Sequence, residues 1–295
     1  MSDGGGRGDA PAVGRLETGD GLPVAYHRFG HGGGRPTLIA HANGFHGRCY
    51  RALADELGPG YDCVAIDQRG HGLTGLRADD HERALSGGAL DWRPLGVDVG
   101  ALARLLAPSG GLVGVGHSMG GAALLMAAHR DPDVFDRLVL FEPVAPPPDA
   151  NPGDPDQMPL VGLALRRRPE FESVEAAIGN YRAKQPMALM RSDVLRDYVV
   201  GGTRPLPHGV TLRCEPAVEA AFFRGSHDNG VWDLLDEIDV PTLVVSGRVE
   251  ADAVTGWARG IADRLPNGVF RYEPDLTHFG PLSHPDRVAD IVRSG

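Results

Sequence analysis

Short apolar runs alternate with helical patterns along most of this chain. The apolar runs, which we predict to be strands, are residues 22–28, 36–40, 63–67, 112–115, 137–141, 242–245 and 269–272. Helical patterns are found at residues 48–57, 97–106, 122–128, 255–265 and 286–292. Parallel strands buried on both faces read as continuous apolar runs, and they need a helical crossover between them. The pattern therefore predicts an α/β fold with a mostly parallel central sheet and helices on both faces.

The alternation is interrupted between Pro143 and Trp232. Two proline-rich stretches, residues 145–148 and 151–155, have the composition of linkers. Helical patterns then follow at residues 174–183, 194–200 and 216–223, and the core pattern resumes at Pro241. We predict that residues 144–231 form a helical cap inserted into an α/β core of residues 15–143 and 232–295. Such a cap is expected over the carboxyl edge of the sheet, where open α/β folds bind ligands.

Composition narrows the class of protein. The chain has 295 residues, 42% of them hydrophobic and 23% charged, which is ordinary for a globular protein. Its net charge of −10 argues against a nucleic-acid surface or binding to an anionic membrane. No apolar stretch is long enough to span a bilayer, and three scattered cysteines argue against a disulfide framework. Residues 1–14 are rich in glycine and lack an apolar segment, so we predict a disordered tail and a cytoplasmic protein.

Residues 116–120, Gly-His-Ser-Met-Gly, lie between a predicted strand and a predicted helix. A serine at such a turn is held on a strained backbone that projects its hydroxyl beyond the sheet edge. The flanking Gly116 and Gly120 allow strand and helix to approach closely. The N-terminus of the helix also directs free N–H groups toward the point where an oxyanion would form. Ser118 is therefore our candidate nucleophile.

A serine hydroxyl needs a base that removes its proton and an acid that orients the base. His278 is the best placed of the twelve histidines, because its loop follows the last predicted strand and returns to the carboxyl edge. Three carboxylates follow neighbouring predicted strands and are candidates for the acid: Glu250, Asp252 and Glu142. The second oxyanion donor is expected from the loop of residues 41–45, after an early strand.

Four segments together carry a resemblance to a known family: residues 41–45, 67–72, 116–121 and 277–281. The chain resembles the α/β-hydrolase superfamily, in its capped, esterase-like branch, from about residue 20 to the end except for the cap. The resemblance implies that Ser118 is the nucleophile and His278 the general base. It also implies that the backbone N–H groups of Met119 and Asn43 form the oxyanion hole. Related loops more often read His-Gly where this chain has His-Ala at 41–42, so Gly44 is an alternative to Asn43.

The position of the acid in the resembling enzymes favours Glu250, three residues past Gly247 and about 28 residues before His278. A glutamate here departs from the aspartate that is usual in these enzymes. Asp252 also has a place at the start of the next predicted helix, where a carboxylate is stabilised in any case. Glu142 ends the strand that leads into the cap, and its alternative role is a hydrogen-bond acceptor at the hinge, although some relatives place the acid there.

These features predict a cofactor-free serine hydrolase that cleaves a largely apolar carboxylic ester or lactone through an acyl-enzyme. A carbon–carbon bond hydrolase, a thioesterase, an acyltransferase and a non-catalytic small-molecule receptor share the same fold and are alternatives. No metal signature is found, and the serine turn explains its glycines better than a dinucleotide loop does. The cap arginines at 166–168, with Arg182 and Lys184, could bind a substrate carboxylate, but we favour a solvated helix face for them.

Overall fold

The computed structural model describes residues 11–30, 32–150, 153–248 and 256–295. Its central sheet has eight strands in the order β1-β2-β4-β3-β5-β6-β10-β11. The strands are β1 (Ala12–Glu17), β2 (Pro23–Arg28), β3 (Arg35–Ala40), β4 (Tyr61–Ile66), β5 (Leu112–His117), β6 (Phe135–Phe141), β10 (Thr242–Gly247) and β11 (Gly268–Glu273). In this sheet β2 pairs antiparallel with both β1 and β4, whereas the neighbours β4, β3, β5, β6, β10 and β11 pair parallel. The predicted mostly parallel sheet is confirmed.

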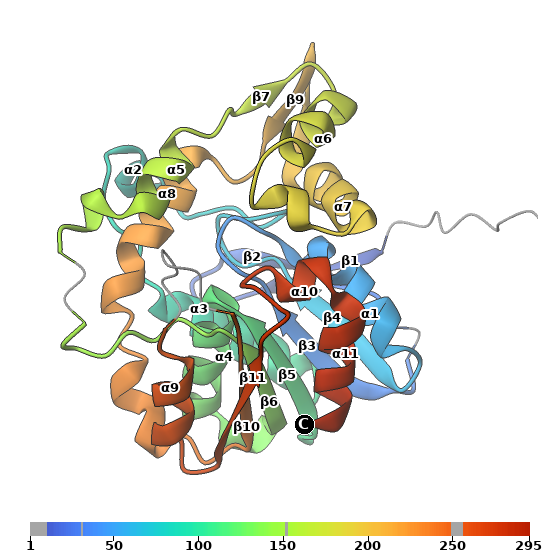
Figure 1. Cartoon of the computed structure of the whole chain (residues 1–295), viewed down its shortest axis with the longest axis vertical. Helices are drawn as coiled ribbons and strands as arrows, with labels where there is room; N and C mark the ends of the chain where they lie inside the picture. Colours follow the sequence, from blue (N-terminus) through green and yellow to red (C-terminus); the bar gives the residue numbers. More distant parts are fainter. Residues whose placement is uncertain (1–10, 31, 151–152, 249–255) are drawn as a thin grey trace, which may run out of the picture.

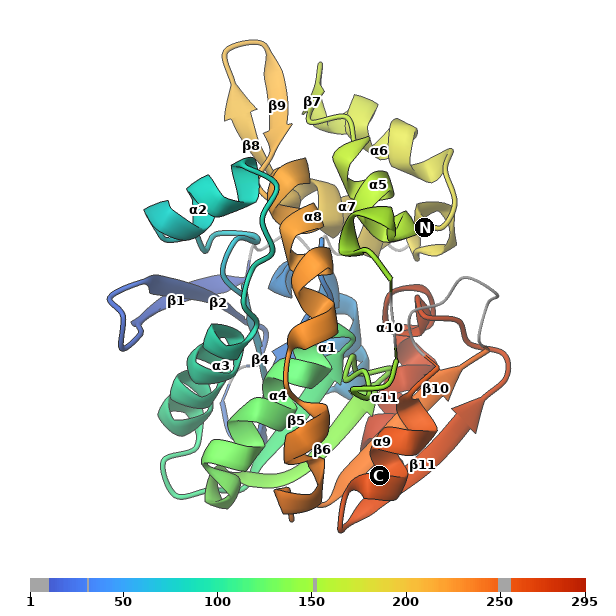
Figure 2. The same ribbon diagram turned by 90° about the vertical axis from the view of Figure 1, so that its left-hand side faces the viewer.

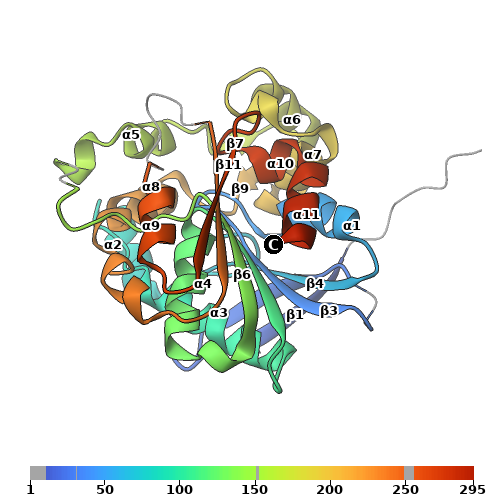
Figure 3. The ribbon, with the colours of Figure 1, turned by 60° about the horizontal axis from the view of Figure 1, so that its bottom comes forward.

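Helices cover both faces of this sheet, as Figure 3 shows. On one side lie α3 (Arg93–Leu106), α4 (Met119–Arg130) and α9 (Ala258–Arg264), and on the other lie α1 (Arg51–Leu57) and α11 (Pro285–Ser294). Successive side chains of β6 show why its residues 138–141 are all apolar. Leu138 and Leu140 join the core on the α3 and α4 side, while Val139 and Phe141 join the core against α1 and α11. A strand buried on both faces has no position left for a polar residue.

The segment predicted to be a cap, described over residues 144–150 and 153–231, lies on one side of the core in Figure 1 and Figure 2. Its helices are α5 (Pro159–Leu165), α6 (Val174–Arg182), α7 (Ser192–Gly202) and α8 (Pro216–Gly225). The cap is not wholly helical, because β7 (Glu170–Phe171), β9 (Gly209–Leu212) and β8 (Thr203–Leu206) form a small antiparallel sheet. The sequence did not predict the hairpin of β8 and β9, because it contains prolines at 205 and 207 and proline is rare within central strands.

Cap and core share one hydrophobic cluster. Val218, Ala221 and Phe222 of α8 are buried together with residues of α3 and α4. Beside α8 packs α2 (Ala78–Leu85), a core helix that the hydrophobic pattern did not reveal. The cap is therefore anchored to the core by apolar packing as well as by its two chain connections.

The predicted tail of residues 1–14 is too long. Residues 12–14 belong to β1, which pairs with β2 through a register that sets Gly14 opposite Tyr26. A Cβ atom at Gly14 would lie 2.1 Å from the Tyr26 ring, so only glycine fits beneath that ring. Residues 1–10 lie outside the described residues. Among the helices that are described, none has the length and apolar character needed to cross a membrane.

Candidate active site

Ser118 lies at the sharp turn between β5 and α4. Its backbone has φ 54° and ψ −115°, a conformation with positive φ that residues other than glycine rarely adopt. A Cβ atom at Gly120 would lie 2.1 Å from the Ala40 carbonyl oxygen, and one at Gly116 would lie 2.6 Å from the Cα of Gly121. The two glycines therefore permit the close packing of β5, α4 and β3 that holds the serine in this conformation.

His278 lies in the loop between β11 and α10 (Gly280–Ser283). Its Nδ1 is 2.6 Å from Oε2 of Glu142. Because a carboxylate accepts only, we assign the proton of the neutral imidazole to Nδ1. This leaves Nε2 with a lone pair that can remove a proton from a nucleophile.

Glu142 is held in its position from several sides. Its side chain is 1% exposed, and Oε1 accepts from the backbone N–H of Gly247 at 2.9 Å and from Oγ of Ser246 at 3.4 Å. The backbone of Glu142 has φ 46°, a second left-handed conformation at a residue other than glycine. Such strain persists where the surrounding structure enforces it, and it is concentrated at functional sites.

The sheet register explains how Glu142 reaches the serine turn. Strands β5 and β6 pair His117 with Phe141, and the N–H of Ser118 donates to the Phe141 carbonyl at 3.0 Å. Ser118 and Glu142 therefore leave the sheet side by side. The preferred acid, Glu250, and its alternative Asp252 lie outside the described residues. Among the three candidate carboxylates, Glu142 is the one that the described structure brings to His278.

In the loop after β3, residues 42–45 include one amide for which the described structure shows no acceptor. Between residues 42 and 45, the N–H of Ala42 donates to Tyr50 Oη, that of Gly44 to His71 Nε2, and that of Phe45 to the Ala42 carbonyl. No acceptor for the N–H of Asn43 is found among the described residues. The N–H of Met119 is the first of α4, where an amide has no partner within the helix. Asn43 and Met119 thus each carry a backbone N–H for which the described residues show no acceptor.

Buried, uncharged histidines support this loop. Burial lowers the pKa of His71 to about 4 and that of His41 to about 3. The single ring proton of His71 is assigned to Nδ1, which donates to the Arg69 carbonyl, and Nε2 then accepts from Gly44. His41 Nε2 accepts from the N–H of Gln68 at 2.9 Å. Both rings can make these bonds only while they are neutral.

We expect the free energy of unfolding to fall between pH 7 and pH 5. A histidine has a pKa of about 6.5 when unfolded, so His71 and His41 bind fewer protons in the folded state than in the unfolded state. Their contribution is complete above the unfolded pKa and is lost as the pH falls toward the folded values of about 4 and about 3. The loss is about 1.4 kcal/mol per pH unit for each histidine. Urea unfolding at several pH values measures it.

Asp20 does not contribute in this window, because its hydrogen bond with Thr18 lowers its pKa to about 2. Replacing the exposed His284 with asparagine serves as the control and should leave the slope unchanged. Equal free energies of unfolding at pH 7 and pH 5 would contradict the expectation.

The cap directly contacts residues 42–45, which are called the oxyanion loop after their expected role. Asn43 Nδ2 donates to the backbone carbonyl of Glu219 in α8 at 3.0 Å. The Glu219 carboxylate pairs with Arg167, whose side chain is only 16% exposed and also donates to the hydroxyl of Tyr181. The interpretation of residues 166–168 as a solvated face is therefore wrong for Arg167. Because Glu219 already neutralises this guanidinium, a substrate carboxylate would have to compete with it.

Other chemistry has less support among the described residues. No group of three or more histidine, cysteine or acidic side chains in the described ranges could hold a metal ion. The three cysteines are buried free thiols. Burial raises the pKa of Cys63 to about 12, and it also raises the pKa of Cys49 and Cys214. These thiols are therefore poor nucleophiles near neutral pH.

The chain was compared with models of protein families, with curated proteins and with solved structures. The model of the Alpha/beta hydrolase family matches residues 29–291. No curated protein matches the chain. The structure is similar to that of E-2-(acetamidomethylene)succinate hydrolase, with 20% identity, a TM-score of 0.79 and coverage of 97% of this chain and 98% of that one.

Two further solved structures are similar over nearly their whole length. The thioesterase domain from the curacin biosynthetic pathway has 19% identity and a TM-score of 0.77, with coverage of 97% of this chain and 100% of that one. A thermophilic esterase from Thermogutta terrifontis has 22% identity and a TM-score of 0.69, with coverage of 96% and 97%. At these identities the similarity shows the fold alone.

Proposed function

Since the chain belongs to the alpha/beta hydrolase family, we propose that it is a cofactor-free serine hydrolase that cleaves a carboxylic ester or lactone. The observation that supports this most directly is the hydrogen bond of 2.6 Å between His278 Nδ1 and Glu142 beside the strained Ser118 turn. A buried carboxylate that fixes the tautomer of a half-exposed histidine is the arrangement that a nucleophilic serine requires. We propose Ser118, His278 and Glu142 as the triad.

In this proposal, the Ser118 hydroxyl attacks the acyl carbon while Nε2 of His278 takes its proton. The amides of Met119 and Asn43 stabilise the oxyanion, which is usually the largest single contribution to such catalysis. His278 then protonates the leaving alcohol, and a water molecule, activated by the same histidine, resolves the acyl-enzyme. Glu142 stays ionised throughout and stabilises the imidazolium.

An apolar substrate suits the surroundings of the site. Phe45 ends the oxyanion loop and Phe279 follows His278, and the centroids of their half-buried rings lie 5.9 Å apart. Phe45 also packs against Tyr198 of the cap, with ring centroids 5.3 Å apart. We propose that this aromatic wall contacts the acyl or alcohol part of the substrate and that the cap selects its size.

A substrate panel tests the proposal against its alternatives. Similar structures are named as an esterase, a thioesterase and a hydrolase of a succinate derivative, so the panel includes esters, thioesters, lactones and β-diketones, with an alcohol as acyl acceptor. We expect turnover of neutral short-chain esters and labelling of one serine per chain by a fluorophosphonate. Preference for a thioester, a β-diketone or acyl transfer would change the reaction class. If the protein shows no turnover of any substrate and no labelling, the proposal is wrong and a receptor is favoured.

A further inference from the structure

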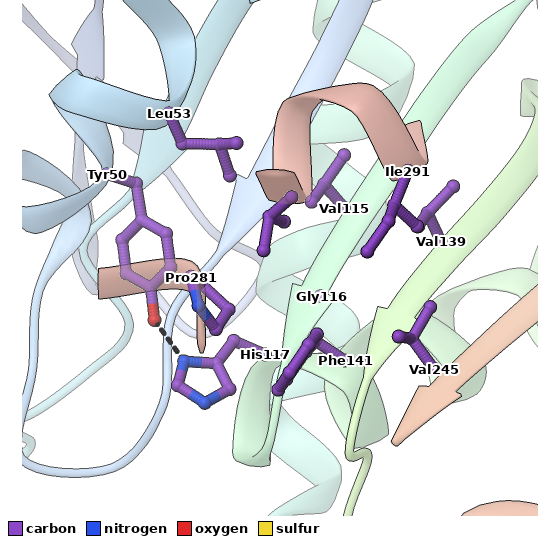
Figure 4. A pocket seen from close by; sticks show the side chains of 11 residues that line it. Tyr50, Leu53, Val115, Gly116, His117, Val139, Phe141, Val245, Pro281 and Ile291 are labelled. Carbon is purple, nitrogen blue, oxygen red and sulfur yellow. Dashed lines mark hydrogen bonds between the residues drawn. The ribbon is translucent and has the colours of Figure 1, made fainter. Parts of the chain in front are cut away.

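The proposed mechanism makes no use of His117, a histidine that is 2% exposed and directly precedes Ser118. Both of its ring nitrogens have partners. Nδ1 is 2.7 Å from Tyr50 Oη, a contact that Figure 4 shows, and Nε2 is 2.9 Å from the backbone carbonyl of His278. The residue before the nucleophile thus bonds to the main chain of the base.

The proton positions in this network follow from its end points. The His278 carbonyl can only accept, so the proton of His117 is on Nε2. Nδ1 therefore accepts the proton of the Tyr50 hydroxyl, whose oxygen accepts in turn from the N–H of Ala42 at 3.2 Å. Burial, and next the nearby His278, lower the pKa of His117, so its ring stays neutral and carries the one proton that this assignment needs.

These bonds join three segments that are far apart in the sequence. Ala42 begins the oxyanion loop, His117 belongs to the serine turn, and His278 lies in the base loop. Figure 4 shows that the pair of Tyr50 and His117 borders a pocket lined by apolar side chains, among them Leu53, Val115 and Phe141. Hydrogen bonds in such low-dielectric surroundings are strengthened, and a donor or acceptor left unpaired there is costly.

We propose that Tyr50 and His117 are positioning residues that hold the oxyanion loop and the base loop in register with Ser118. Glu142 fixes one atom of the His278 ring, whereas His117 fixes the backbone to which that ring is attached. Both constraints are needed because a catalytic side chain must be held to within about 0.5 Å of its productive position. This inference rests on the proposed function, but it concerns residues that do not touch the substrate.

Two single substitutions each break part of the hydrogen-bond network that joins Tyr50, His117 and the His278 carbonyl. His117→Leu leaves the His278 carbonyl without a donor, and Tyr50→Phe removes a single oxygen. Each is expected to lower kcat for a neutral ester by roughly tenfold, the effect of one buried hydrogen bond, with KM within about twofold of wild type. His117→Gln keeps an N–H at the end of the side chain and should recover most of the rate.

The double variant Tyr50→Phe/His117→Leu gives a sharper test. Because Tyr50 acts largely through His117, the combined loss should be smaller than the product of the two single losses. Tyr61→Phe on β4 and His129→Leu on α4 are matched controls outside the network and should keep wild-type kcat. Tyr50→Phe serves alone if His117→Leu does not fold.

A measurement without turnover separates positioning from simple destabilisation. The proton NMR signal of His278 Nδ1–H, identified by its loss in His278→Gln, should move in His117→Leu and return toward its original position in His117→Gln. Wild-type kcat in both single variants, or an unmoved signal, would overturn the proposal. If wild type neither hydrolyses esters nor reacts with a fluorophosphonate, the proposed function fails, and the NMR signal alone decides the role of His117.

Discussion

Replacing Ser118 with alanine is expected to lower kcat for a chromogenic short-chain ester by roughly 10³-fold or more. The hydroxyl is the only group that this substitution removes. The amides of Met119 and Asn43 remain, so a small residual rate from oxyanion binding is expected. A fluorophosphonate should label wild type once per chain and should leave the alanine variant unlabelled.

The loss should come from chemistry and not from unfolding. The strain at Ser118 resides in its backbone, with φ 54°, and the close contacts of the turn are made by Gly116 and Gly120. Alanine tolerates that conformation about as well as serine does, so the denaturation midpoint should stay near wild type. Ser226→Ala, in the cap, is the matched control and should retain full activity. Labelling that persists in the Ser118 variant would reveal a different nucleophile.

The core of the fold could be predicted because its strands are buried on both faces. The buried part of a strand such as β6, residues 138–141, then has no polar position, and its apolar run is visible without any knowledge of its neighbours. The serine turn was visible for a related reason, since only glycine fits at positions 116 and 120. Both features show in a few consecutive residues, although the contacts that require them, such as that of Gly120 with Ala40, are made with distant segments.

The features that the sequence did not reveal depend on contacts with other segments. Strand β1 exists because it pairs with β2, and its alternating, largely exposed residues resemble a tail when read alone. Arg167 is half-buried because Glu219, far along the chain, neutralises it. The pair of Tyr50 and His117 likewise has no local signature, because its two residues are separated by β4, α2 and α3.

The choice of the acid illustrates the same limit. Spacing along the chain relates Glu250 to His278, whereas the distance in space between Ser118 and Glu142 is set by the register of β5 against β6. A sequence shows the first relation and not the second. Only the pairing of His117 with Phe141 reveals that the residue after each strand emerges at the same place.

Glu142→Gln is accordingly expected to lower kcat by roughly 10²- to 10⁴-fold with little change in KM. An amide keeps the shape of the carboxylate but introduces an NH₂ group. In one orientation this group faces the Nδ1–H of His278, and in the other it faces the N–H of Gly247. The first favours the tautomer with its proton on Nε2, which cannot accept the serine proton. In the second orientation, the new NH₂ group faces the N–H of Gly247, so two donors point at each other in a buried site. Either way the charge that stabilises the imidazolium is lost.

Glu250→Gln and Asp252→Asn, measured beside Glu142→Gln, decide between the three carboxylates. If Glu142 is the acid, both should stay within a few-fold of wild type, because neither change alters the hydrogen bond to His278. Glu142→Asp tests the length of the side chain separately from its charge, because it retains the carboxylate but is shorter by one methylene. Its kcat should lie between those of wild type and Glu142→Gln. A Glu250→Gln variant that loses 10²-fold or more, with Glu142→Gln near wild type, would transfer the role of the acid to Glu250 and leave Glu142 as a buried acceptor at the junction of core and cap.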